Sequence, residues 1–223
     1  MKLTKIDAAE VNLCAAIRLF FADAHPVPVH TLAGAARGVL SVLGEKLETD
    51  IFLNELAKNR DVSPREYLRK ATAALNFMKH ADRDPTAVLE FADEANDFML
   101  FWACRDFVSI TKGLPVEAQV FDAWFFATQV KKVSNGGLRW QESVKACIGL
   151  FPGVRSAARP EKKRIAFKVL SDALEKPALS ANRKNNSLAA HLKVLCGLVI
   201  RADSAGEHSG RPCGHLAPLR QDS

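Results

Sequence analysis

The residues best suited to chemistry lie in one polar segment, 76–85, centred on His80. Histidine titrates near neutral pH, so it can transfer protons, and as a cation it can hold a phosphate. Asn76, Lys79 and Arg83 stand beside it in the sequence and complete the candidate catalytic set. The alternative is that these side chains form the solvated face of an amphipathic helix, with His80 near its C-terminus, where the helix dipole favours a cation. No nucleophile is indicated beside His80, so the segment defines candidates without defining a reaction.

A second candidate set comes from the uneven distribution of charge. The chain of 223 residues carries 31 Lys+Arg and 25 Asp+Glu. Residues 1–150 are nearly neutral, with 18 basic and 19 acidic residues, whereas residues 151–223 have 13 and 6. A basic surface suits phosphate contacts, although a solvated helix and tail would show the same excess. The candidate nucleic-acid-binding residues are Arg155, Arg159, Lys162, Lys163, Arg164 and Lys168.

Metal and cofactor motifs are weak in this sequence. His208, Cys213 and His215 form one group of ligand types, but this trio lacks a fourth ligand and a rigid scaffold. There is no Cys-x-x-Cys pair, His-Glu-x-x-His motif or phosphate-binding glycine loop. We therefore expect no cofactor and no metal.

The N-terminal segment and the cysteines indicate a cytoplasmic protein. Asp7, Glu10 and Arg18 interrupt any continuous apolar signal segment. The longest wholly apolar runs, 98–104 and 194–200, are too short to cross a bilayer, so no membrane partner is expected. Five scattered cysteines do not resemble a disulfide framework and fit a reducing compartment.

The elements that must position these residues are helices. Apolar residues recur at helical spacing along most of the chain, and no strand-like alternation of useful length appears. Thr4 with Asp7, and Ser63-Pro64-Arg65-Glu66, are helix start signals. The helices predicted from these patterns cover 4–22, 32–47, 50–59, 63–80, 84–111 with a break, 115–133, 138–150, 160–175 and 187–201. The fold class expected is an all-α, multi-helix bundle with a disordered C-terminal tail.

The same patterns divide the chain into three parts. Residues 1–150 are expected to form a helical bundle domain, and 151–201 a basic helical extension packed on it or appended to it. Residues 202–223 have little to bury and are expected to be a disordered tail.

Aromatic residues concentrate between positions 91 and 126. Side chains of this size at this density are expected in the core. If they exceed what one bundle can cover, the surplus would form a homodimer or protein-partner interface. The residues concerned are Phe91, Phe98, Phe101, Trp102, Phe107, Phe121, Trp124, Phe125 and Phe126.

Two segments carry a resemblance to known proteins. The segment His30-Thr31-Leu32-Ala33-Gly34-Ala35-Ala36 and the segment from Asn76 to Pro85 resemble a functionally uncharacterised family of bacterial all-helical proteins, over roughly residues 2–150. That resemblance implies a helical fold and no activity.

The chain is also loosely similar to HEPN-type helical domains, many of which are ribonucleases of toxin and defence systems. In those domains an arginine and a histidine, separated by four to six intervening residues, form the RNA-cleaving site across a dimer. Two pairs have this spacing, Arg18 with His25 and Arg201 with His208, which is close to the number expected by chance. The first pair has Leu19 where the resemblance implies a polar residue.

The sequence therefore favours a cytosolic helical protein that acts by binding a protein partner or a second copy of itself, rather than an enzyme. One alternative is a HEPN-like, RNA-directed protein with its site at His80 and Asn76. The other is nonspecific nucleic-acid binding through the basic last third.

Overall fold

The computed structural model describes residues 1–49, 52, 63–82, 84–129 and 138–175. Within these residues all regular secondary structure is helical, which confirms the all-α expectation. The expected helices at 50–59 (Phe52 apart) and 187–201, and the expected tail at 202–223, lie outside the described residues. The helices are α1 (Lys5–Phe21), α2 (Pro26–Lys46), α4 (Pro64–Ala71), α5 (Ala73–Lys79), α6 (Ala95–Thr111), α7 (Val116–Gln129), α8 (Leu138–Leu150) and α9 (Arg159–Leu174).

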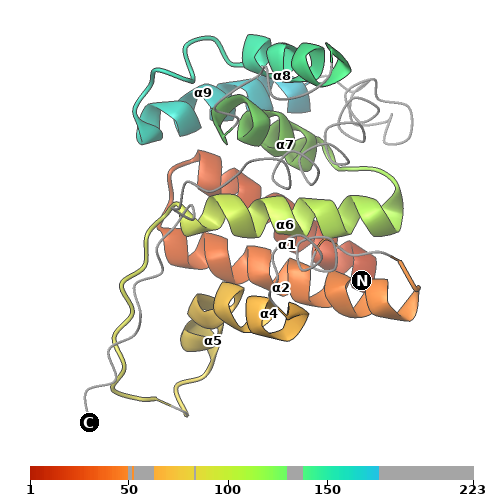
Figure 1. Cartoon of the computed structure of the whole chain (residues 1–223), viewed down its shortest axis with the longest axis vertical. Coiled ribbons are helices and arrows are strands. Elements are labelled where there is room, and N and C mark those ends of the chain that lie inside the picture. The colour runs from red at the N-terminus through yellow and green to blue at the C-terminus, as the bar shows by residue number, and fades with distance from the viewer. Residues whose placement is uncertain (50–51, 53–62, 83, 130–137, 176–223) are drawn as a thin grey trace.

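The helices pack around a central group formed by α1, α2 and α6 (Figure 1). Helix α5 packs on α2 and brings α4 with it, at one side of this group. On the other side α7 contacts α1 and α6, and both α8 and α9 pack on α7. Helix α9 also contacts α1, so this part of the basic last third lies against the bundle.

Both predicted start signals are confirmed. The Thr4 hydroxyl accepts a hydrogen bond from the Asp7 amide at 3.1 Å, and the Asp7 carboxylate accepts one from the Thr4 amide at 2.9 Å. The Ser63 hydroxyl accepts a hydrogen bond from the Glu66 amide at 3.2 Å, at the start of α4. These side chains satisfy amide groups that the first turn of a helix leaves without backbone acceptors.

The start of α2 differs from the prediction, which placed it at Leu32. The helix begins at Pro26, because proline is tolerated in the first turn, where its missing amide has no intrahelical acceptor. His25 caps this end: its Nδ1 accepts a hydrogen bond from the Val27 amide at 3.3 Å. The proline-containing segment 26–31, which the predicted helix bounds left as a connection, therefore forms the first turns of α2.

The region between positions 63 and 95 also differs from the prediction. The helix expected at 63–80 is interrupted at Thr72, whose hydroxyl donates to the Leu68 carbonyl at 2.7 Å. Asp84 opens no helix: its carbonyl accepts the Ala87 amide in a turn, and α6 begins only at Ala95. The segment before α6 is instead tied to α9 through the contacts of Asp93 described below.

The core takes up the aromatic residues that the sequence analysis placed there. Trp102, Phe121, Trp124 and Phe126 are buried, together with Phe20 and other residues of α1. The remaining aromatic side chains of α6 and α7 are at least partly buried. These two helices therefore supply no large aromatic surplus for an interface. The exposed large apolar side chains lie elsewhere and include Val11, Val42, Leu47, Val88, Leu150, Phe167 and Leu174.

Helix α2 shows how small residues permit close packing. A Cβ atom placed on Gly34 would lie 2.6 Å from the Leu75 side chain of α5, so a larger residue there would force the Leu75 side chain to move. Among the described helices, α2 alone is long and apolar enough to cross a membrane by length and composition. Half of its most apolar window is buried inside the bundle, as is usual for a core helix.

Candidate functional site

Two of the six basic candidates, Arg159 and Lys163, belong to an ion-pair cluster that attaches α9 to the bundle. The Arg159 guanidinium donates to the Asp93 carboxylate at 2.6 Å and to both carboxylate oxygens of Asp97 at 2.7 and 3.0 Å. The Lys163 ammonium lies 2.5 Å from Asp93 and 2.8 Å from Asp23. We call these five residues the α9 ion-pair cluster.

An aromatic ring from α1 supports this cluster. The Phe20 ring centroid lies 4.6 Å from the Lys163 ammonium nitrogen and 5.6 Å from the Arg159 guanidinium carbon, both within cation–π range. Only 2% of the Lys163 side chain is exposed. A nucleic-acid phosphate cannot reach such a lysine without breaking the cluster. Lys163 and Arg159 therefore have structural partners already.

The cluster also changes the proton affinities of its members. Burial alone would raise the pKa of Asp93, but the hydrogen bonds from Lys163 and Arg159 lower it below the usual value. Asp97 is more buried, and this desolvation raises its pKa despite the Arg159 contact. Burial would lower the pKa of Arg159, whereas the two carboxylates raise it above its ordinary value. Arg159 is thus a permanent cation here.

The other basic candidates do not form one patch with these two. Arg164 makes a two-bond ion pair with Glu161, both bonds 2.6 Å long, on the exposed face of α9. Arg155 is exposed in the turn that follows α8. Lys162 and Lys168 make no ion pair with any described residue, and they lie about 120° apart around the helix. Binding of nucleic acid through this region stays a prediction.

The His80 segment lies at the end of α5, where Asn76 and Lys79 are exposed and His80 is partly exposed. The nearest carboxylate to His80 belongs to Asp82, with 3.8 Å between its oxygen and Nδ1. Asn76 contributes its backbone carbonyl to the His80 amide at 3.0 Å, a helix-end hydrogen bond. Arg83 lies outside the described residues. The structure thus brings no second catalytic side chain into hydrogen-bond range of the His80 ring within the part of the chain it describes.

The described members of the HEPN-like pairs have other partners. Arg18 forms an ion pair with Glu117 of α7, and His25 caps α2. The second pair lies outside the described residues, as do the candidate metal ligands His208, Cys213 and His215. No cluster of three or more His, Cys, Asp and Glu side chains suited to a metal occurs in the described residues. Ribonuclease activity stays a prediction.

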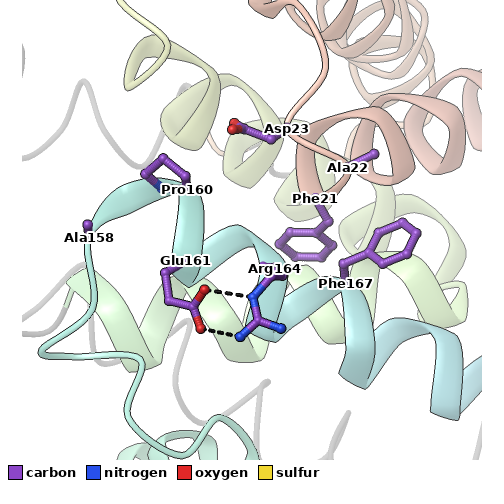
Figure 2. A pocket seen from close by; sticks show the side chains of 8 residues that line it. All are labelled: Phe21, Ala22, Asp23, Ala158, Pro160, Glu161, Arg164 and Phe167. Atoms are coloured by element: carbon purple, nitrogen blue, oxygen red, sulfur yellow. Dashed lines mark hydrogen bonds and ion pairs between the residues drawn. The ribbon is translucent and has the colours of Figure 1, made fainter.

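A groove between the end of α1 and helix α9 is the feature best suited to recognition (Figure 2). Its volume is about 590 Å³. Figure 2 shows the rings of Phe21 and Phe167 on its two sides, with the Glu161–Arg164 ion pair beside them. The groove is lined by Phe21, Ala22, Asp23, Ala158, Pro160, Glu161, Arg164 and Phe167.

An apolar stripe on α9 continues from this groove. Pro160, Phe167 and Leu174 follow one another at intervals of seven residues, so they lie along one side of the helix. Phe167 is 44% exposed and Leu174 is 41% exposed. Sequence analysis did not single out this stripe. The seven-residue spacing was the signal that would have identified the stripe.

The chain matches no protein-family model, no curated protein sequence and no solved structure. Its function must therefore be inferred from the geometry of its own residues.

Proposed function

We propose that this protein binds a protein partner, and that the partner presents an amphipathic helix with acidic flanks to the α1–α9 groove. The observation that carries the proposal is the exposed, heptad-spaced stripe of Pro160, Phe167 and Leu174 beside an apolar groove. Aromatic and leucine side chains that are exposed to this extent and in register are costly in water and are typical of contact surfaces.

The spacing of the stripe selects a helical partner. Apolar residues repeated every seven positions form the seam along which two helices pack side by side. The Phe167 ring stands at the centre of the stripe and also forms one side of the groove (Figure 2). An aliphatic side chain of the partner would enter the groove between Phe167 and Phe21, and Leu174 would extend the contact by two helical turns.

The charges beside the stripe select an acidic partner. Lys168 and Arg164 are exposed next to Phe167, and Lys168 has no ion-pair partner among the described residues. If a second copy packed its own stripe here in an antiparallel orientation with Phe167 at the centre, each Lys168 would lie on the same side of the helix pair as its counterpart, and the two positive charges would repel. Carboxylates on the partner would instead pair with Lys168, which favours a different protein over self-association.

The test is a selection of helical peptides from a displayed library on the full chain, with Phe167→Asp as the counter-selection target. We expect the selected peptides to carry aliphatic residues seven positions apart with Asp or Glu beside them. Phe167→Asp should weaken their binding at least tenfold, because it places a charge in an apolar contact. Isothermal titration calorimetry measures both affinities.

Val42→Asp is the matched control, because Val42 is an aliphatic residue on α2 that is 52% exposed and lies outside the groove. It should leave peptide binding unchanged. Peptides that bind the wild type and Phe167→Asp equally would contradict the proposal. So would sedimentation showing a wild-type dimer that Phe167→Asp dissociates, because the groove would then belong to a second copy.

A further inference from the structure

Another cavity lies between the first turn of α2, helix α5 and the segment that follows α5. It has a volume of about 420 Å³, within the range of small-molecule sites. Its lining is largely apolar and includes Val27, Phe77, Leu89 and Phe91. The cavity is separate from the α1–α9 groove, and no residue lines both.

Buried contacts hold the walls of this cavity in place. The Phe91 ring packs edge-on against His30, with 4.9 Å between the ring centroids and 72° between the ring planes. His30 is 2% exposed, and its Nδ1 lies 3.0 Å from the side-chain oxygen of Asn96 on α6. The Thr31 hydroxyl contacts the Met78 sulfur at 3.8 Å, which links α2 to another lining residue. These contacts fix the aromatic wall before any ligand arrives.

Among the described residues that line the cavity, Asp84 is the one with an ionisable side chain. Its backbone carbonyl accepts the Ala87 amide, but its carboxylate has no hydrogen bond or ion pair with any described residue. Asp82 and Glu90, close by in the chain, are also exposed. Lys79, the one basic residue of α5, does not line the cavity. The described lining thus supplies one negative charge and no positive charge, which favours a cationic ligand.

We propose that this cavity binds a small organic cation in which an ammonium group is joined to an apolar body. The faces of the Phe77 and Phe91 rings carry negative charge density that attracts a cation, and Asp84 supplies a full negative charge at the same opening. The apolar part of the ligand would contact Leu89 and Val27. This site is independent of the partner-binding groove proposed above.

Three ligands of similar shape test whether the cavity prefers a cation. They are phenethylamine, which is a cation, 2-phenylethanol, which is neutral, and 3-phenylpropanoate, which is an anion. Two-dimensional NMR of the labelled full chain measures the affinity of each and maps the shifted amides. We expect phenethylamine to bind most tightly, with shifts at residues 77–91, then the neutral alcohol, then the anion. Equal affinities for all three, or shifts confined to other residues, would overturn the proposal.

Two carboxylate variants sharpen the assignment. Asp84→Asn should weaken phenethylamine binding about fivefold, the size expected for one solvent-accessible ion pair, and leave 2-phenylethanol binding unchanged. Asp82→Asn is the control, because Asp82 is equally exposed to solvent but does not line the cavity. Both residues are exposed, so neither change threatens folding. If Asp82→Asn weakens amine binding as much as Asp84→Asn, only the general negative field acts and no site exists at Asp84.

Discussion

Helix α9 and the end of α5 are the two regions that the sequence marks for chemistry, and their ionisable residues differ in kind. In α9, Arg159 and Lys163 are drawn inward and make several contacts of 2.5–3.0 Å with carboxylates from other elements. At the end of α5, His80 remains partly in solvent, with one carboxylate 3.8 Å away. The two α9 cations connect this helix to distant parts of the chain through ion pairs. The carboxylate near His80, in contrast, belongs to Asp82, two positions further along the chain.

The difference teaches that charge density along a sequence does not indicate which charges are available for a ligand. The partners of Arg159 lie more than 60 positions before it, and Lys163 meets Asp23 across 140 positions. No local sequence pattern predicts ion pairs between residues so far apart in the chain. A cation is available for recognition only if the fold leaves it unpaired, as holds for Lys168 with respect to the residues that the structure describes.

The largest effect that we expect in this comparison is on stability. Lys163→Ala would leave Asp93 and Asp23 without their ammonium partner and lose the contact with Phe20. Because Lys163 is buried but Asp23 is half exposed, we expect a loss of about 2–4 kcal/mol, slightly below the range for fully buried pairs. Urea unfolding followed by circular dichroism measures it.

Lys168→Ala provides the control on the same helix and should change the free energy of unfolding by less than about 0.5 kcal/mol. Equal losses for the two lysines would mean that the α9 ion-pair cluster does not attach the helix. The comparison between buried and available cations would then fail.

A smaller effect is expected from the buried histidine beneath the segment that follows α5. Burial lowers the pKa of His30, and the Asn96 hydrogen bond only partly opposes this. The unfolded chain therefore takes up a proton more readily than the native state, so stability falls as the pH drops through the ordinary value near 6.5. We therefore expect protonation of His30 to lower the free energy of unfolding between pH 7 and 5.5.

Urea unfolding of the wild type and of His30→Gln at both pH values isolates this contribution. The glutamine keeps a polar side chain for Asn96 but has no proton to gain. The variant should therefore show the smaller decline in stability on acidification, even if it is less stable at pH 7. An identical decline in the two proteins would show that protonation of His30 is not coupled to folding.

Much of the fold was predictable because it depends on local signals. Capping residues such as Thr4 and Ser63 define helix starts through contacts three positions away, and apolar periodicity defines the buried faces. The errors arose where a local signal had two meanings. Proline at position 26 fits both a helix stop and a helix start, and Asp84 fits both a cap and an isolated turn.

The candidate site was less predictable because it depends on relations between distant residues. The basic residues of α9 were candidates from the start, but the sequence did not reveal that Arg159 and Lys163 would be paired while Lys168 has no ion pair with a described residue. Phe21 and Phe167 line the same α1–α9 groove although they are far apart in the sequence. No rule based on residue spacing predicts that these two side chains lie close together. Of these features, only the apolar stripe on α9 could have been predicted from the sequence, because its residues repeat every seven positions.

The smallest effect should come from His80. It is partly exposed, no other candidate catalytic side chain lies within hydrogen-bond range of its ring among the described residues, and it does not line the neighbouring cavity. His80→Ala should therefore change the free energy of unfolding by less than about 0.5 kcal/mol and leave peptide binding at the α1–α9 groove unchanged. The decisive addition is an RNA-cleavage assay of the wild type and this variant with a labelled single-stranded RNA. Cleavage by the wild type that His80→Ala removes, with stability intact, would make the end of α5 an active site and reverse the comparison between the two regions.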